Sequence, residues 1–266
     1  MFSSAWKAAC FVVVSLAANT ASAVTILDDE FTSFSLGTTW QAASVLGATG
    51  VPDVSLSSDG SFLTMVSGSD NSDFRGIETI SSISTASYSS ITLDARVKPG
   101  AFGVSDSSRM IEITLSGSSG AWVSVFASGN TAPGPDWSDD YADSAGNSAT
   151  TGSFAHCAPL CDAFRSFILT VDGSGVELEV RNEDGSLHGF NPIFSNLTLT
   201  DFGSDITISL RHLKVLGGND AGGLVDRVTV SAIAVPEPST GLLLASGLVA
   251  MAVGRRRRVY AAPRRH

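Results

Sequence analysis

Hydrophobic and polar residues alternate strictly in several segments of the chain. Such period-two patterns occur at residues 91–98, 111–116, 176–181 and 206–211. A strand that buries one face and exposes the other produces this pattern, because successive side chains point to opposite faces of a sheet. Clusters of Gly, Pro, Ser and Asp separate these segments, and no sustained 3.6-residue apolar stripe replaces them. We therefore expect about ten to twelve short strands in an all-β, antiparallel sandwich or jelly roll over residues 24–234.

The alternation slips once, near the end of this region. His212 falls in the buried register between Leu210 and Leu213, and a β-bulge there would restore the pattern. We expect His212 to be a packing or bulge residue. His156 and His188 lie in loop-like sequence without evident acidic or metal partners.

Charged residues are scarce, at 16% of the chain against about a quarter in an average soluble domain. The formal net charge of −10 has the wrong sign for binding nucleic acid, whose phosphates attract basic surfaces. Residues 24–237 carry 9 Lys and Arg against 26 Asp and Glu, a net charge of −17. Polyanions are therefore disfavoured as partners, whereas divalent cations suit such a chain as counter-ions.

The first 23 residues have the three parts of a secretory signal peptide. Lys7 is the positive residue, residues 8–18 form the apolar core, and Ala21 and Ala23 give the small-x-small pattern that signal peptidase cleaves. A short membrane anchor and a buried helix are the alternatives, but the apolar run is short for a span of roughly 30 Å. Cleavage after Ala23 would also remove Cys10.

A second tripartite segment, residues 235–266, closes the chain. Its motif consists of Val235, Pro236, Glu237, Pro238 and Ser239. Apolar residues 240–254 follow, and a basic end at 255–266 opens with Arg255, Arg256, Arg257 and Arg258. The prolines end the preceding strand, and the Arg cluster holds the C-terminus on the cytoplasmic side of a membrane. The 16 residues between Pro238 and Arg255 are slightly fewer than the roughly 17–25 of a stable transmembrane helix.

This tail resembles the PEP-CTERM sorting signal of exported bacterial proteins, which a membrane peptidase called exosortase processes. The resemblance makes Pro236, Glu237 and Pro238 the recognition element. It implies an exported protein that is anchored transiently in the inner membrane and then reaches the cell surface or the extracellular matrix. Signal peptidase and exosortase would be its partners during export. An ordinary C-terminal membrane anchor is the alternative.

Two further motifs resemble concanavalin A-like sandwiches, the group that includes laminin G domains and family-16 glucanases. Asp28, Asp29, Glu30 and Phe31, followed by Trp40, resemble the opening strand of that group. Residues 224–230 resemble its final strand. Because one fold hosts many functions, this resemblance implies a fold and no activity.

The sequence does not show the catalytic acids of a glycoside hydrolase. Family-16-like enzymes carry them on one strand as E-x-D-x-x-E, and a retaining enzyme needs two carboxylates about 5–5.5 Å apart. Glu112 is the best candidate, but Thr114 stands at the second acidic position, and Glu177 and Glu179 have no third acid. Nucleophile-elbow, P-loop and H-E-x-x-H motifs are also missing from the sequence. We therefore expect no enzymatic activity, with an atypical glycoside hydrolase as the alternative.

Residues 128–152 are predicted to form a loop rich in acidic and aromatic side chains. Its candidate Ca²⁺ ligands, all carboxylates, are Asp136, Asp139, Asp140 and Asp143. Its candidate platforms for stacking on a sugar are Trp137 and Tyr141. The spacing of the acids differs from an EF-hand loop, so a solvated acidic insertion is the alternative. No cofactor other than Ca²⁺ is expected.

Cys157 and Cys161 are the two cysteines left after signal cleavage. In an exported protein they favour a disulfide, because the turn between them can bring their Cα atoms within ~4.4–6.8 Å. A metal site with His156 and Asp162 is the alternative.

Taken together, the sequence predicts an exported surface or matrix protein with a non-catalytic sandwich for glycan binding or matrix structure. Extracellular polysaccharide is the expected ligand. Ice binding is a weaker hypothesis, because Thr198 and Thr200 supply one Thr pair and no repeated array.

Overall fold

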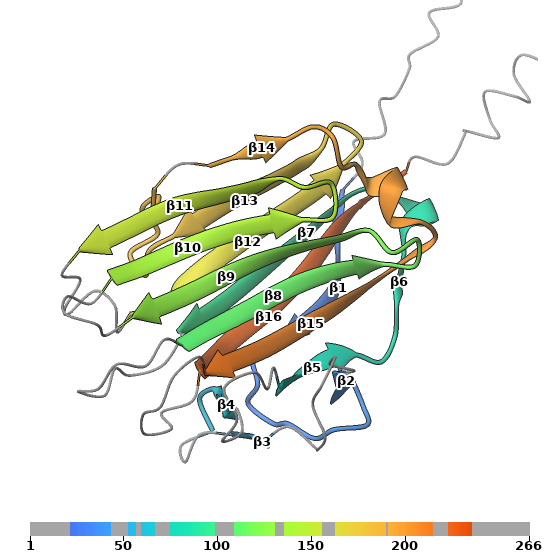
Figure 1. The fold of residues 1–266 in the computed structure, drawn as a ribbon. Coiled ribbons are helices and arrows are strands. Elements are labelled where there is room, and N and C mark those ends of the chain that lie inside the picture. Colours follow the sequence, from blue (N-terminus) through green and yellow to red (C-terminus); the bar gives the residue numbers. More distant parts are fainter. Residues whose placement is uncertain are drawn as a thin grey trace, which may run out of the picture. The chain divides into compact units, whose positions relative to one another are not determined.

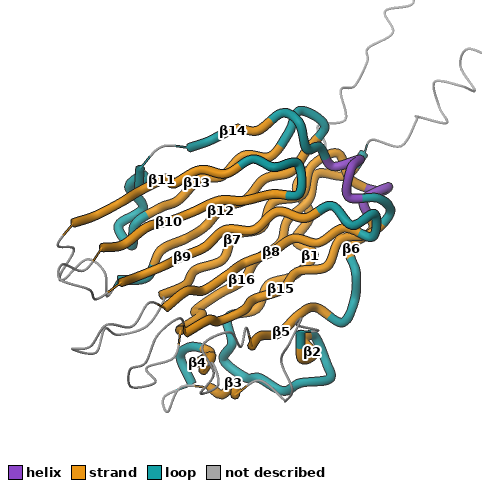
Figure 2. The backbone as a smooth tube through the Cα atoms, in the orientation of Figure 1, coloured by secondary structure: helices purple, strands orange, loops and turns teal. Residues whose placement is uncertain are grey.

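The computed structural model describes residues 22–43, 53–56, 60–66, 75–98, 109–130, 136–155, 163–189, 191–214 and 223–235. This part of the chain forms two antiparallel sheets that lie over each other (Figure 1). Figure 2 shows that strands make up most of its backbone. The all-β antiparallel sandwich predicted from the alternation is confirmed. The sixteen strands exceed the number predicted because several edge strands are only two to four residues long.

Each sheet has eight strands. Sheet A has the order β14-β13-β12-β7-β16-β4-β3, with β1 also paired to β16. Its strands are β1 (Ala23–Asp29), β3 (Asp53–Leu56), β4 (Leu63–Val66), β7 (Tyr88–Lys98), β12 (Arg165–Asp172), β13 (Val176–Arg181), β14 (Ile193–Phe194) and β16 (Gly223–Ala234).

Sheet B has the order β11-β10-β9-β8-β15-β5-β2, with β6 also paired to β15. Its strands are β2 (Trp40–Ala42), β5 (Arg75–Thr79), β6 (Ile83–Ser84), β8 (Arg109–Gly117), β9 (Trp122–Asn130), β10 (Asp136–Asp143), β11 (Ser148–Ala155) and β15 (Asp205–Lys214). Two 3-10 helices, η1 (Thr85–Ser87) and η3 (Leu199–Phe202), contact each other at one end of the sandwich.

The core lies between the sheets and is built by the predicted alternation. On β7, Ile91 and Leu93 are fully buried, whereas Thr92 and Asp94, which alternate with them, are partly exposed. β13 repeats this pattern, and so does β15 except at the buried Ser209. On β8 the inward-facing Ile111, Ile113 and Leu115 alternate with Glu112 and Thr114, which are themselves buried. Each buried aliphatic side chain contributes about 1.5–3 kcal/mol to folding. The residues that alternate with them point to the outer faces of the sheets.

The opening motif forms a local hydrogen-bonded unit. The carboxylate of Asp29 accepts hydrogen bonds from the Phe31 N–H and from Nε1 of Trp40, both at 2.8 Å. Phe31 adopts a left-handed φ of 50°, and its ring packs 5.9 Å from that of the buried Trp40. This backbone conformation costs energy for a non-glycine residue, and the Asp29 hydrogen bonds offset that cost.

Two local predictions were wrong. Most of the predicted loop at 128–152 belongs to strands, because β9 runs to Asn130 and β10 and β11 form a hairpin. Among the described side chains of β10, those that face the core are Asp139, Tyr141 and Asp143, so the usual apolar pattern of a buried strand face is absent over this part of the strand. The second error is the bulge near His212, because β15 pairs with β8 without a register shift. His212 is buried, as expected of the packing residue that was the other expectation for this position.

Several predicted features lie outside the described residues. They are residues 1–21 of the predicted signal segment, the cysteines Cys157 and Cys161, and the tail beyond Val235 with its predicted helix at 240–254 and its Arg cluster. Ala23, the last residue of the predicted signal segment, is the first residue of β1. Within the described part, no helix is long and apolar enough to cross a membrane.

Candidate functional site

The outer face of sheet B carries cross-strand rows of polar and aromatic side chains. One row consists of Arg211 on β15, Glu112 on β8, Phe126 on β9 and Asp140 on β10. Residues paired in this way project from the same face of a sheet. The face is the outer one, because the intervening residues, such as Ile111 and Ile113, are buried in the core.

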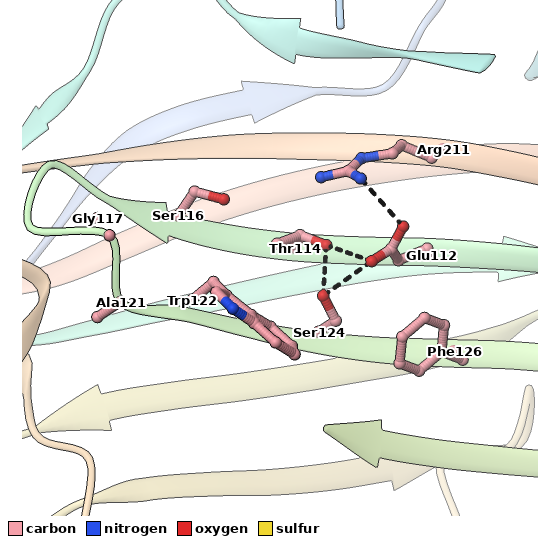
Figure 3. A pocket seen from close by; sticks show the side chains of 10 residues that line it. Glu112, Thr114, Ser116, Gly117, Ala121, Trp122, Ser124, Phe126 and Arg211 are labelled. Carbon is pink, nitrogen blue, oxygen red and sulfur yellow. Dashed lines mark hydrogen bonds and ion pairs between the residues drawn. The ribbon is translucent and has the colours of Figure 1, made fainter. Parts of the chain in front are cut away.

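A pocket of about 470 Å³ opens on this face (Figure 3). Its volume falls within the range of ordinary ligand sites. Its lining comes from β8, the β8–β9 turn, β9 and β15, and consists of Glu112, Thr114, Ser116, Gly117, Gly120, Ala121, Trp122, Ser124, Phe126 and Arg211.

Glu112 is held in one orientation at the centre of the pocket. Its Oε1 accepts hydrogen bonds from Oγ of Ser124 at 2.9 Å and from Oγ1 of Thr114 at 3.1 Å. Its Oε2 lies 3.5 Å from Nη1 of Arg211. The side chain is 10% exposed, so these partners offset the cost of placing a carboxylate in a nearly closed environment. Oε2 has lone pairs left for a hydroxyl group of a ligand.

Two aromatic rings of β9 flank this carboxylate. Trp122 and Phe126 line the pocket on either side of Ser124, as Figure 3 shows. Trp122 is 37% exposed and Phe126 is partly exposed, although both are large hydrophobic residues. Their Cα atoms are about 13 Å apart, from the rise of four strand residues. Exposed rings beside hydrogen-bonding groups suit a ligand with both apolar and hydroxylated faces.

The described lining of this pocket contains a single carboxylate, that of Glu112. The other acidic side chains named on this face form hydrogen bonds with residues on strands farther from the pocket. Asp140 accepts a hydrogen bond from Thr150 on β11 at 2.7 Å, and Glu78 accepts one from Gln41 on β2 at 3.0 Å. The described residues thus offer no second acid beside Glu112 for the 5–5.5 Å pair of a retaining glycosidase.

The structure does not bring the four predicted Ca²⁺ ligands together. Asp139 and Asp143 are buried on the inner face of β10, whereas Asp140 lies on the outer face. The side chain of Asp136 lies outside the description. Across the described residues, no group of three or more His, Cys, Asp and Glu side chains is arranged to hold a metal ion.

The prediction that Tyr141 stacks on a sugar is wrong. Its ring is 1% exposed and stacks on Phe194 at 4.3 Å between ring centroids, while its hydroxyl donates to Asp143 at 2.6 Å. Burial, and then the Asp143 hydrogen bond and charge, raise the pKa of Tyr141. The side chain of Trp137, the other predicted platform, lies outside the description.

A buried ionic cluster links the two sheets instead. Nη1 of Arg165, on β12, lies 2.9 Å from Oδ2 of Asp139 and 2.9 Å from Nε2 of His188. Nδ1 of His188 lies 2.8 Å from Oδ1 of Asn182, which fits a neutral ring that donates through Nδ1 and accepts through Nε2. Burial and the charge of Arg165 lower the pKa of His188 to about 4. His188 therefore has partners that the sequence did not reveal.

Comparison with known proteins identifies the C-terminal segment. Residues 234–258 match the PEP-CTERM protein-sorting motif. The chain carries a PEP-CTERM sorting tail. This confirms the prediction made from Pro236, Glu237 and Pro238, and it indicates an exported protein that is processed at the membrane. No curated protein matches the sequence significantly.

Solved structures with similar folds are concanavalin A-like and lectin-like sandwiches, as predicted. The CBM2 module of the evolved Dit of Lactobacillus casei BL23 phage J-1 has a TM-score of 0.57 and 11% identity, covering 80% of this chain and 97% of its own. Arcelin-5, a lectin-like defence protein of Phaseolus vulgaris, has a TM-score of 0.53 and 10% identity, with 81% and 100% covered. SCLam, a non-specific endo-β-1,3(4)-glucanase of family GH16, has a TM-score of 0.52 and 14% identity, with 79% and 91% covered. At these identities the likeness establishes the fold alone.

Sequence reasoning found Glu112 but missed Trp122, Phe126 and Arg211. A signal for the aromatic residues was present, because Trp122 and Phe126 occupy the outward phase of a strand whose inward phase is Val123, Val125 and Ala127. Two such rings on one outer strand face, beside polar groups, form the kind of exposed apolar patch that occurs at ligand-binding grooves.

Proposed function

We propose that this exported protein binds extracellular polysaccharide through the outer face of sheet B and does not cleave it. The observation that carries the proposal is the pocket in which Trp122 and Phe126 flank Glu112. The rings would stack on the apolar faces of sugar rings, while Glu112 and Arg211 would bond their hydroxyl groups. We further propose that exosortase releases the protein to the cell surface or the extracellular matrix.

The structural neighbours are consistent with this role. They include a CBM2 module and a lectin-like protein, and also a glucanase. The single carboxylate in the described pocket lining favours binding over cleavage, because glycoside hydrolases generally use two.

An atypical glycoside hydrolase is the second candidate. It is favoured by the position of Glu112, which the sequence pointed to as the best match to a catalytic acid and which the structure places at the centre of the pocket. In such an enzyme Glu112 would be the acid or the nucleophile.

A polysaccharide panel with two readouts separates these candidates. Residues 23–235 form one compact unit, so the fragment 24–235 is used. It is incubated with insoluble and soluble glycans, and both its retention on the glycan and the release of new reducing ends are measured. We expect retention without release. Trp122→Ala should weaken binding about ten-fold or more, as expected for a central aromatic contact. Ile193→Ala is the matched control, because Ile193 is 66% exposed on sheet A.

Glu112→Gln gives the decisive comparison. The amide retains an oxygen that can accept the Ser124 and Thr114 hydrogen bonds, so fold and binding should largely persist. Release of reducing ends by the wild type, lost in Glu112→Gln, would establish the hydrolase instead. If the wild type and Trp122→Ala are retained equally, the binding site does not lie on this face.

A further inference from the structure

The described lining of the pocket on sheet B contains one cationic group, the guanidinium of Arg211. It faces the carboxylate of Glu112, with Nη1 3.5 Å from Oε2 (Figure 3). Nη2 lies 3.4 Å from Oγ of Ser209, and Nε has no hydrogen-bond partner among the described residues. The cross-strand neighbour of Arg211 on β5 is Gly76, which has no side chain. Because a guanidinium carries more N–H donors than these contacts use, Arg211 keeps donors for a ligand.

Glu112 is fixed beside this guanidinium. The hydrogen bonds from Ser124 and Thr114 hold its Oε1, at 2.9 and 3.1 Å, and its side chain is only 10% exposed. Its Oε2 therefore stays on the side of Arg211. A ligand group that reaches Nη1 of Arg211 in this pocket also meets Oε2 of Glu112.

Such a pair of opposite charges discriminates between neutral and acidic sugars. A hydroxyl group can accept a hydrogen bond from Nη1 and donate one to Oε2 at the same time. A carboxylate would suit an isolated guanidinium, which binds carboxylates through two parallel N–H groups. Beside Glu112, however, its attraction to Arg211 is offset by repulsion from Oε2, because both charges lie at similar distances. The ligand carboxylate would then lose its hydration without compensation.

The other described charges near the pocket act in the same direction. Asp140 lies in the same cross-strand row as Glu112, two strands away or about 10 Å. Glu78 lies opposite Ser209, on the side of β15 away from β8. Both are acids, and residues 24–237 carry a net charge of −17. An acidic polymer is therefore repelled at long range as well as at the pocket.

We propose that Glu112 and Arg211 make this pocket selective for neutral sugars over uronic acids, and that Glu112 closes a carboxylate-binding site at Arg211. The inference rests on the proposed glycan-binding function and names its class of ligand. Glu112 supplies the repulsive element that excludes the acidic ligand, while Trp122 and Phe126 contact either kind of sugar ring. Removing the charge of Glu112 should therefore open the pocket to uronic acids.

Oligosaccharide pairs that differ only at C6 test this selectivity. Neutral glucan, mannan and galactan oligomers are each compared with the form whose C6 hydroxyl groups are oxidised to carboxylates, and dissociation constants for residues 24–235 are measured at one salt concentration. The wild type should bind the neutral member of a pair at least about ten-fold more tightly. In Glu112→Gln this preference should shrink about ten-fold or reverse, because Arg211 no longer faces a carboxylate. Adding Arg211→Gln should abolish the gain in binding of the oxidised member.

Glu177→Gln is the matched control, because it removes the same charge from an exposed position of β13 on the other sheet. It should leave the preference unchanged. If the wild type binds both members equally, or if Glu177→Gln narrows the preference as much as Glu112→Gln does, the inference is wrong. The proposed function would still stand in that case, provided that Trp122→Ala weakens binding. If the wild type binds neither member of any pair, the proposed function and the inference both fail.

Discussion

Replacing Arg165 by methionine tests the buried ionic cluster between the sheets. Arg165 is 4% exposed and Asp139 is 0% exposed, and the two are joined at 2.9 Å. Burial lowers the pKa of Arg165 to about 10 against the opposing effect of Asp139, so the guanidinium is still charged at pH 7. Removing it leaves a buried carboxylate without its main counter-ion, which costs about 3–5 kcal/mol of unfolding free energy.

His188 makes this loss depend on pH in a characteristic way. In the wild type the pKa of His188 is lowered to about 4 from 6.5, so its contribution to stability is complete above pH 6.5 and is lost as the pH falls towards 4. Between pH 8 and pH 5 this amounts to about 2 kcal/mol. In Arg165→Met, the ring lies 3.3 Å from Asp139 with no guanidinium opposing its charge, so the pKa of His188 should rise from its wild-type value, although burial still lowers it. The variant should therefore lose less stability on acidification than the wild type does.

Urea unfolding of residues 24–235 at pH 8 and pH 5 measures both effects. His188→Gln is the control that removes the titration, and the wild type is compared with it to isolate the His188 contribution. Arg165→Met combined with Asp139→Leu should recover most of the lost stability, because no buried charge is left unpaired. If Arg165→Met loses stability on acidification as the wild type does, the assigned electrostatics of the cluster are wrong.

Three further perturbations have defined outcomes. Asp29→Ala should cost about 1–3 kcal/mol in urea unfolding, because it leaves the buried Nε1 of Trp40 without its acceptor. Gly117→Ala should lower the thermal midpoint by several degrees, because a Cβ there would lie 2.3 Å from the carbonyl oxygen of Phe202. Millimolar Ca²⁺ should leave the melting curve unchanged, because Asp139 is already paired with Arg165; a clear rise in the midpoint would show a Ca²⁺ site that includes undescribed residues.

The sequence predicted the sandwich wherever the inward-facing residues of a strand are apolar. The alternation at residues 91–98 became β7 and that at 206–211 became part of β15. It failed at β10 because the described side chains that face the core there are Asp139, Tyr141 and Asp143. Asp143 bonds locally, to Tyr141 and Asn147. The partner of Asp139 lies on β12 and the ring that stacks on Tyr141 lies on β14, and no local pattern reveals such distant pairing.

The candidate site was only partly predictable for the same reason. Glu112 could be singled out from its own strand. Trp122 and Phe126 lie on β9 and Arg211 lies almost a hundred residues farther along the chain, on β15. Only the register of β8 with both neighbouring strands brings the three beside Glu112, and register depends on the packing of the whole sheet.

The central claim is that the outer face of sheet B binds glycan, and a crystal structure with a bound oligosaccharide tests it most directly. Residues 24–235 are crystallised with an oligosaccharide of the glycan retained in the polysaccharide panel. We predict a sugar ring stacked within about 4 Å of the Trp122 ring, with a hydroxyl group bonded to Glu112. An oligosaccharide bound elsewhere, for instance in the polar pocket lined by Asp28, Ser33 and Thr38 near the opening strand, would contradict the account.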